Sequence, residues 1–316
     1  FLTAIDPYGH ELWRWTFPVN KLNQQTEQLS PLSSRPAYTE TENELTVKAN
    51  KRTFIFSKKD GQLKGISVDN RKISFANGPR FIGARRADRS LDQFYNHDDE
   101  KAKEKDRTYS EFPDAAVFTK LDVKEDGGNL VVTANYKLGN LDKAQWTINP
   151  SGELALDYTY NFSGVVDLMG IRFDYPEDQV ISKRWLGAGP YRVWQNRIHG
   201  TQYDVWENDY NDPIPGETFT YPEFKGYFGD VSWMNIQTKE GTISLTNETP
   251  DAYIGVYQPR DGRDRLLYTL PESGISVLNV IPPVRNKVNS TDLCGPSSQP
   301  KWVNGPQTGR VIFRFM

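Results

Sequence analysis

Alternation of apolar and polar residues with a period of two is the feature that most constrains this fold. It is clearest after the turn sequence Asn149-Pro150-Ser151-Gly152, where one face of an extended strand would carry Leu154, Leu156, Tyr158, Tyr160 and Phe162. Similar paired runs flank Asp60-Gly61, Asp126-Gly127-Gly128 and Lys239-Glu240-Gly241. No segment of useful length repeats at 3.6 residues, and His97–Arg107 is charged all round. The sequence therefore predicts an all-β, antiparallel two-sheet sandwich.

The beginning of the chain is expected to form a separate unit. Residues 1–20 show the pattern strand, turn, strand around Asp6-Pro7-Tyr8-Gly9, and Lys21–Pro36 is polar and contains two prolines, which is typical of a linker. The sequence starts in mid-pattern and without an initiator Met. We therefore expect a piece of a longer polypeptide, with residues 1–36 ending a preceding domain and residues 37–316 forming the main one.

Composition and charge narrow the classes of partner. The chain has 316 residues, a formal charge of -3 and a pI near 5.8, which gives no electrostatic reason to bind nucleic acid or acidic lipid. No apolar run approaches the roughly 20 residues of a membrane-spanning helix. Cys294 is the only cysteine, which excludes an intrachain disulfide and a thiolate-rich metal site and leaves the compartment open. We expect no cofactor and no metal, although Asp209, Asp212 and Glu217 could ligate a hard cation.

One segment, Arg184–Trp233, holds four of the eight tryptophans together with charged residues and chain-breaking Gly and Pro, among them Gly187 and Gly189. Aromatic faces beside polar groups are what a sugar site needs. The candidate carbohydrate-binding residues are Trp185, Tyr191, Arg192, Trp194, Asn196, Arg197, His199, Trp206, Glu217, Glu223 and Lys225. The alternative is an aromatic-rich loop that closes one end of a β core. If the segment binds glycans, Trp194→Ala should weaken binding without unfolding the domain.

Three separated motifs resemble those of one known family. Asn77–Ser90, N-G-P-R-F-I-G-A-R-R-A-D-R-S, is similar to the G-P … W-R-A-P-T-D-N-D signature in the C-terminal domain of family 2 β-galactosidases. Trp185–Arg197, W-L-G-A-G-P-Y-R-V-W-Q-N-R, is similar to its G-R-G-P-x-E-N-Y-x-D-R segment. Asp292–Met316 contains D-L-C-G-P and ends in V-I-F-R-F-M, like the closing loop and strand of the family. The order and rough spacing match over Tyr38–Met316.

The resemblance implies a galactose-mutarotase-like β-supersandwich that follows an immunoglobulin-like domain and a catalytic barrel. The chain also departs from the family pattern. Gly83 stands where the family has Trp, Arg192-Val193-Trp194 replaces E-N-Y, and Cys294 occupies a position that some relatives fill with an aromatic residue. Galactose contacts of the family therefore cannot be transferred wholesale, and the glycan is open.

The resemblance implies a non-catalytic role for this chain, with its parent protein a glycoside hydrolase. Family 2 hydrolysis uses two carboxylates on the barrel, and Asn43-Glu44 and Asn247-Glu248 are not in a βα context. The expected job is to shape the substrate cleft or bind carbohydrate, with the barrel of the same polypeptide as partner. Two alternatives are a stand-alone carbohydrate-binding module and an aldose 1-epimerase-like enzyme, in which His199 would pair with Glu217, Glu223 or Glu272.

Overall fold

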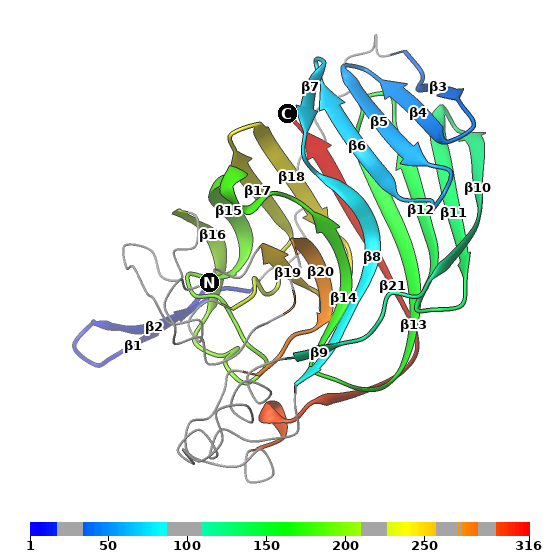
Figure 1. The fold of residues 1–316 in the computed structure, drawn as a ribbon. Helices are drawn as coiled ribbons and strands as arrows, with labels where there is room; N and C mark the ends of the chain where they lie inside the picture. Colours follow the sequence, from blue (N-terminus) through cyan, green and yellow to red (C-terminus); the bar gives the residue numbers. More distant parts are fainter. Residues whose placement is uncertain (18–33, 87–108, 210–225, 257–270, 272–273, 284–294) are drawn as a thin grey trace.

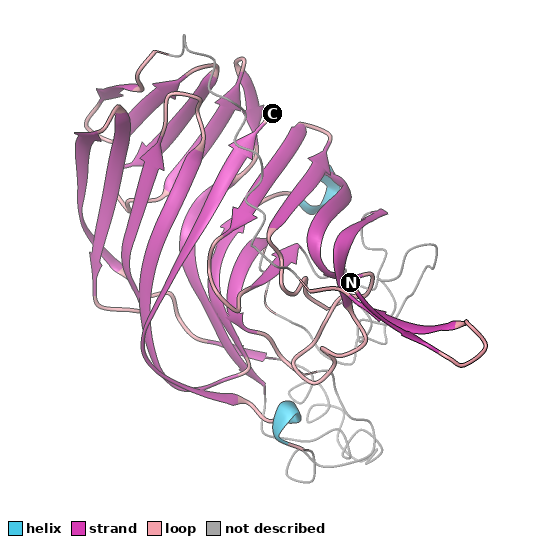
Figure 2. Ribbon diagram, turned by 180° about the vertical axis from the view of Figure 1, so that it is seen from behind, coloured by secondary structure: helices cyan, strands magenta, loops and turns pink. Residues whose placement is uncertain are grey.

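The computed structural model describes residues 1–17, 34–86, 109–209, 226–256, 271, 274–283 and 295–316. Within this part of the chain nearly all regular structure is β-strand, with two single-turn 3₁₀ helices, η2 (Glu177–Gln179) and η5 (Pro296–Ser298). Two large antiparallel sheets pack face to face (Figure 1), and Figure 2 shows the same two layers from behind. The predicted all-β, two-sheet sandwich is confirmed. Residues 21–33 of the expected linker and His97–Arg107 lie outside the described residues.

The first large sheet has ten strands. Its main path runs β19-β20-β14-β8-β6-β5-β4-β3, with β7 paired to β6 and β9 paired to β8. The strands are β3 (Ala37–Glu40), β4 (Glu44–Ala49), β5 (Arg52–Ser57), β6 (Leu63–Val68), β7 (Arg71–Ile73), β8 (Ala76–Arg86), β9 (Tyr109–Glu111), β14 (Leu168–Asp174), β19 (Tyr253–Val256) and β20 (Ile275–Val280).

The second large sheet has nine strands in the order β10-β11-β12-β13-β21-β18-β17-β15-β16. The strands are β10 (Val117–Asp126), β11 (Asn129–Lys137), β12 (Leu141–Ile148), β13 (Leu154–Val166), β15 (Val180–Gly189), β16 (Gln202–Asp209), β17 (Trp233–Thr238), β18 (Gly241–Asn247) and β21 (Lys301–Phe315). Strand β21 lies between β13 and β18, and its pairing with β13 runs from Leu154↔Phe313 to Val166↔Lys301.

The predicted glycine turn and the predicted alternation along β13 are both present in the structure. Gly127 and Gly128 both have positive φ, at 57° and 88°, which is the backbone of a tight hairpin turn that side chains resist. They join β10 to β11. Along β13, the predicted apolar face is turned inward, because Leu154, Leu156 and Tyr160 are fully buried.

An aromatic cluster joins the two sheets through the core. Phe313 of β21 lies 5.1 Å from Phe75 and 5.4 Å from Phe173, measured between ring centroids. Phe173 in turn contacts Trp146 of β12 at 6.0 Å. All four side chains are fully buried. Tilted and edge-on ring pairs of this kind add to the stabilisation from buried apolar area, so this cluster holds the layers together.

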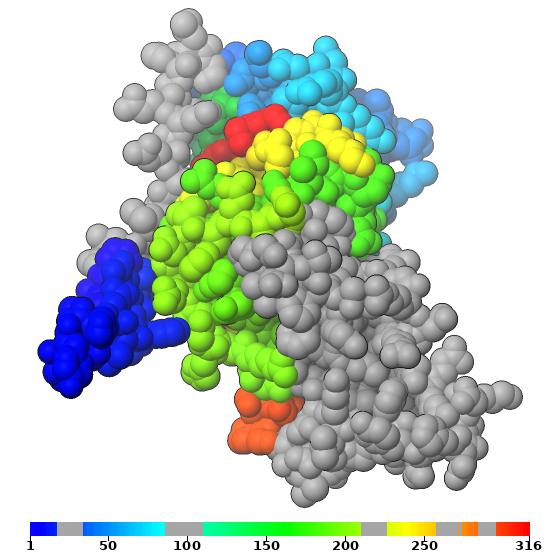
Figure 3. All heavy atoms as spheres, turned by 90° about the vertical axis from the view of Figure 1, so that its left-hand side faces the viewer, coloured from blue at the N-terminus to red at the C-terminus, as the bar shows by residue number. Residues whose placement is uncertain are grey.

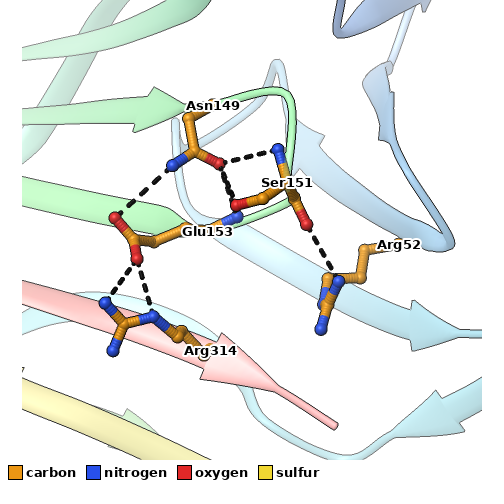
Figure 4. A network of polar contacts seen from close by, with 5 residues as sticks. All are labelled: Arg52, Asn149, Ser151, Glu153 and Arg314. Atoms are coloured by element: carbon orange, nitrogen blue, oxygen red, sulfur yellow. Dashed lines mark hydrogen bonds and ion pairs between the residues drawn. The ribbon is translucent and has the colours of Figure 1, made fainter. Parts of the chain in front are cut away.

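Polar contacts close one end of the sandwich (Figure 4). Arg314 of β21 donates from Nε to Oε2 of Glu153 at 2.6 Å, and both side chains are largely buried. Arg52 of β5 crosses from the other sheet and donates from Nη1 to the carbonyl of Ser151 at 2.9 Å. The side-chain oxygen of Asn149 accepts a hydrogen bond from the N–H of Ser151 at 3.0 Å, which fixes the turn. Both layers are therefore tied at the turn between β12 and β13.

A second polar contact joins the layers at the turn between β17 and β18. The carboxylate of Glu240 accepts hydrogen bonds from the N–H of Ser74 at 2.9 Å and from its hydroxyl at 2.6 Å. The Tyr175 hydroxyl also donates to it, at 3.1 Å. Ser74 precedes β8 and Tyr175 follows β14, so one carboxylate links a turn of the nine-stranded sheet to two segments of the other.

The N-terminal hairpin is not hydrogen-bonded into either large sheet. Strands β1 (Leu2–Ile5) and β2 (Glu11–Trp15) pair only with each other among the described strands. Figure 3 shows this hairpin projecting from the body. Its turn is fixed by Asp6, whose carboxylate accepts hydrogen bonds from the N–H groups of Tyr8 at 2.9 Å and His10 at 2.8 Å. The strand–turn–strand prediction for residues 1–20 is confirmed for the described residues 1–17.

The structure corrects the expectation that Gly187 and Gly189 break regular structure. Both lie inside β15, which pairs with β16 and β17. A Cβ atom at Gly189 would fall 2.4 Å from the ring of Trp206, and one at Gly187 would fall 2.9 Å from the carbonyl oxygen of Gly229. These glycines permit close packing against a neighbouring strand and loop. The sequence alone does not distinguish a glycine with this role from a glycine in a turn.

We predict that Phe313→Ala destabilises the domain by about 3–5 kcal/mol, because it leaves a cavity in the aromatic cluster. The matched control is Trp302→Ala on the same strand, where the ring is 73% exposed and the change should stay within about 0.5 kcal/mol. Urea unfolding of both variants, followed by circular dichroism, checks this. Equal losses for the two variants would contradict the assignment of the core.

Alkaline pH should destabilise the fold through Tyr158. Burial raises the pKa of Tyr158 to about 12, and its hydrogen bond with Thr249 offsets part of that increase. An unfolded tyrosine titrates near pH 10, so between about pH 10 and 12 the unfolded state loses a proton that the folded state keeps. Stability is therefore full below this window and falls as pH rises through it. Tyr158→Phe should reduce the fall in the urea unfolding midpoint between about pH 10 and 12. The control Tyr8→Phe, at an exposed ring, should leave that fall unchanged.

Candidate glycan-binding site

Within the predicted segment Arg184–Trp233, the chain leaves β15 after Gly189. Residues 191–197 then cross the outer face of the ten-stranded sheet, the face turned away from the nine-stranded sheet. The N–H of Val193 donates to the carbonyl of Tyr227 at 2.7 Å, and the N–H of Tyr227 donates back at 2.8 Å. A further N–H, from Gln195, donates to the carbonyl of Pro282 at 3.1 Å. Backbone hydrogen bonds thus hold this segment in place.

A second apolar cluster lies beneath this segment, separate from the inter-sheet core. Phe81 of β8 belongs to the main core, whereas its neighbour Ile82 points the other way, as alternation along a strand requires. Trp194 is 1% exposed and meets Tyr227 edge-on at 5.7 Å between ring centroids. The members of the cluster are Ile82, Ala84, Leu168, Val193, Trp194, Tyr227, Leu278 and Ile281.

The burial of Trp194 changes its expected behaviour. An indole that packs under the segment offers no exposed ring face to a sugar, and its removal leaves a cavity. The expectation that Trp194→Ala spares the fold is therefore not supported by its position. The alternative interpretation from the sequence, an aromatic residue that closes part of the core, describes this residue.

Side-chain amides connect the segment to η5. Gln195 donates from Nε2 to the carbonyls of Ser297 at 2.8 Å and Gln299 at 2.7 Å. Asn196, a predicted site residue, donates from Nδ2 to the hydroxyl of Ser298 at 3.0 Å. The sequence analysis missed Gln195, since a single glutamine carries no pattern that marks it as buried. These bonds position the chain immediately before the exposed Arg197.

Two cations flank one aromatic ring close to this segment. Arg192 lies with its guanidinium carbon 5.3 Å from the ring centroid of Phe228, and Lys183 lies with Nζ at 5.9 Å. Both side chains are buried, and the edge of Phe228 meets Trp185 at 4.8 Å. Cation–π contacts compensate part of the cost of burying charge. Lys183 was missed, although it shares a strand face with Trp185, two residues on.

Trp185 and Trp206 are direct partners across β15 and β16. Trp185 is fully buried, and its indole N–H donates to the carbonyl of Ala188 at 3.0 Å. Trp206 is half-buried and donates to the carbonyl of Gln202 at 3.1 Å. Trp185 is thus part of the core, whereas Trp206 is partly buried and packs against that core.

The structure divides the predicted site residues into three groups. Tyr191 (47% exposed), Arg197 and His199 lie on the surface of one short segment. Buried or half-buried side chains support that segment or the adjoining strands, namely Trp185, Arg192, Trp194, Asn196 and Trp206. Glu217, Glu223 and Lys225 lie outside the described residues, as do Asp212 of the possible cation site and Cys294. The described surface available to a glycan at this segment is therefore Tyr191, Arg197 and His199.

A charged cluster on β8 and β14 was not predicted as a site. Arg80 and Arg172 are direct partners across the two strands, and Arg80 forms an ion pair with Asp174. Asn77 donates to the same carboxylate at 2.9 Å. Burial lowers the pKa of the Arg172 guanidinium, and the charge of Arg80 lowers it further. Asn77 and Arg80 belong to the first of the three sequence motifs, a signal that could have identified them.

Neither a metal centre nor a membrane helix is found in the described part of the chain. No group of three or more His, Cys, Asp or Glu side chains there could hold a metal ion. No helix among the described residues is long and apolar enough to cross a bilayer.

Comparison with known proteins assigns the family. A family model described as "Beta galactosidase small chain" matches residues 48–283, which is more than half of the chain. The chain belongs to the β-galactosidase small-chain family. This match confirms the domain identity implied by the three motifs. No curated protein sequence matches the chain.

Solved structures of low sequence identity also align with this family member. A galactose 1-epimerase from Lactobacillus acidophilus has 10% identity and a TM-score of 0.47, with 90% of this chain and 99% of that chain covered. A galactose mutarotase-like protein from Lactobacillus casei has 11% identity and a TM-score of 0.36, with 89% of this chain and 100% of that chain covered.

Trp194→Ala should destabilise the domain by about 3–5 kcal/mol, as expected for a buried aromatic residue. Tyr191→Ala, three residues away and exposed, should change unfolding by less than about 0.5 kcal/mol. If glycans bind at this segment, Tyr191→Ala should weaken binding while leaving the unfolding midpoint unchanged. Thermal unfolding and fluorescence titration of the two variants check both statements. An unchanged midpoint for Trp194→Ala would show that this indole is not part of the core.

Proposed function

We propose that this chain is the non-catalytic C-terminal domain of a family 2 glycoside hydrolase, β-galactosidase-like, which shapes the substrate cleft or binds carbohydrate. The observation that carries the proposal is the match to the β-galactosidase small-chain family over residues 48–283. The glycosidic bond would be cleaved on a catalytic barrel of the same polypeptide, against which this domain packs.

The surroundings of the two Asn-Glu pairs support a structural role for them. Glu44 is the first residue of β4, and its N–H donates to the hydroxyl of Thr41 at 3.1 Å. Glu248 follows β18 and forms an ion pair with Arg310 at 3.0 Å. The two carboxylates therefore belong to different sheets. Retaining glycosidases need two carboxyl groups about 5 Å apart on either side of the bond.

The glycan-binding part of the proposal rests on the surface of residues 191–199. Tyr191 supplies an exposed aromatic ring, and Arg197 and His199 supply hydrogen-bonding groups beside it. The hydrogen bonds of Gln195 and Asn196 to residues 297–299 give this surface a fixed backbone. Preorganised polar groups lose less entropy on binding, which favours a recognition surface over a flexible loop.

The exposed apolar side chains of the N-terminal hairpin favour its docking against a neighbouring domain. Phe1, Leu2, Ile5 and Leu12 are all more than half exposed, and Trp13 and Trp15 are 44% and 41% exposed. A two-stranded hairpin alone is marginally stable in water, and a run of exposed apolar side chains is typical of a docking surface. We propose that residues 1–36 comprise the end strands and linker of a preceding immunoglobulin-like domain.

The proposal is tested on the full 316-residue chain with three assays. Hydrolysis of a nitrophenyl galactoside should not exceed the buffer rate, and polarimetry should show no acceleration of galactose mutarotation. Titration with galactose and galacto-oligosaccharides, followed by tryptophan fluorescence, should give saturable binding that weakens in Tyr191→Ala.

Two results would contradict the proposal in different ways. Hydrolysis by the purified chain would place catalytic carboxylates within it. Accelerated mutarotation, lost in His199→Ala, would favour the epimerase-like alternative, since that reaction needs an acid and a base beside the anomeric centre.

A further inference from the structure

A cavity of about 440 Å³, lined by polar and apolar groups in about equal measure, lies between the end of the N-terminal hairpin and the nine-stranded sheet. Thr16, just after β2, forms one wall, and Tyr203 of β16 and Ser232, just before β17, form another. The loop between β18 and β19 contributes Asp251. A volume of this size is within the range of about 300–1,000 Å³ that is usual for small-molecule sites. None of the predicted glycan-binding residues lines this cavity.

The lining suits a neutral ligand that is rich in hydroxyl groups. Hydroxyls of Thr16, Tyr203 and Ser232 can donate and accept, and the carboxylates of Asp230 and Asp251 accept only. Among the described residues that line the cavity, none is Lys, Arg or His. Two negative charges with no cation beside them disfavour phosphate, sulfate or carboxylate ligands. A sugar donates its hydroxyl protons to such acceptors.

The two carboxylates line the same cavity. Burial raises the pKa of the neighbouring Tyr253, and the charges of Asp230 and Asp251 raise it further. Each aspartate has a positive φ, at 49° and 53°. Asp and Asn are among the few side chains that tolerate this conformation, so Asn can replace either residue without backbone strain.

The hydroxyl groups of Tyr203 and Thr16 differ in their hydrogen bonding. The Tyr203 hydroxyl lies 2.6 Å from the hydroxyl of Ser232, which fixes the phenol at the wall. Among the described residues, the hydroxyl of Thr16 is buried and makes no hydrogen bond. A buried hydroxyl without a partner is costly, and rotation of the Thr16 side chain toward the cavity would let a ligand hydroxyl satisfy it.

We propose that this cavity, lined by Thr16, Tyr203, Asp230, Ser232 and Asp251, binds a neutral monosaccharide or the end unit of a glycan. A divalent cation is a weaker fit, because calcium takes about 6–8 oxygen ligands and the described residues bring no three acidic side chains together. The site goes beyond the proposed function, since it is distinct from the surface of residues 191–199. It also makes the hairpin one wall of a binding site.

The experiment is calorimetric titration of the full chain with galactose, glucose and glycerol. Thr16→Val keeps the shape of the side chain and removes the hydroxyl, so sugar affinity should fall severalfold with no loss of stability. The double variant Asp230→Asn, Asp251→Asn should reduce affinity by about tenfold or more, because hydrogen bonds to charged groups are the stronger ones. The matched control is Thr246→Val, whose hydroxyl is also buried without a hydrogen bond among the described residues but does not line the cavity.

The outcomes separate this site from the proposed one. Sugar binding that is weakened by Thr16→Val and by the aspartate variants, but not by Thr246→Val or Tyr191→Ala, supports the cavity. Binding lost only in Tyr191→Ala would overturn it in favour of residues 191–199. Absence of saturable sugar binding, or calcium binding in its place that the aspartate variant abolishes, would also overturn it. Hydrolysis by the chain would refute the proposed function and leave this result unaffected.

Discussion

The packing of phenylalanines across the sandwich is the interaction on which the remaining structure depends. Phe313 and Phe315 of β21 meet Phe75, and Phe313 also meets Phe173, so one strand of the nine-stranded sheet holds the facing layer at several points. Polar contacts between the sheets accompany this packing, among them those of Arg52 and Glu240 and the hydrogen bond from the Tyr160 hydroxyl to Asn279. The apolar contacts supply the stabilisation, and the polar contacts, which have few alternative partners, fix how the layers are aligned.

This core determines what the outer face can carry. Because Phe81 and Ile171 point inward from β8 and β14, their neighbours Ile82 and Arg172 must point outward. The apolar outward positions are covered by residues 193–195 and 227, and the charged ones remain beside them as the Arg80–Arg172–Asp174 cluster. The segment that carries Tyr191, Arg197 and His199 is therefore supported by the sheet, even though it has no regular structure over most of its length.

Much of the fold follows from local signals in the sequence, and much of the candidate site does not. Alternation along β13 and the glycines at Gly127 and Gly128 were sufficient to predict strands and hairpins. Neither signal contains the strand order, since the pairing of β13 with β21 joins segments far apart in the chain. Tryptophan is also ambiguous, because Trp194 and Trp302 belong to the same residue type and only tertiary contacts bury one of them. The cavity beside Thr16 is lined by five separate segments of the chain, so no sequence motif marks it.

The central place of β21 has a consequence for the order of folding. Strands β13 and β18 both border it, yet β21 is synthesised after either of them. Before residues 301–315 are made, the strands β10-β11-β12-β13 and β18-β17-β15-β16 have no strand to join them into one sheet. Unpaired edges are templates for wrong pairing, and pairing between distant segments is slow because the loop entropy is lost first. The nine-stranded sheet can therefore be completed only after β21 has been synthesised, which makes it a late event in folding.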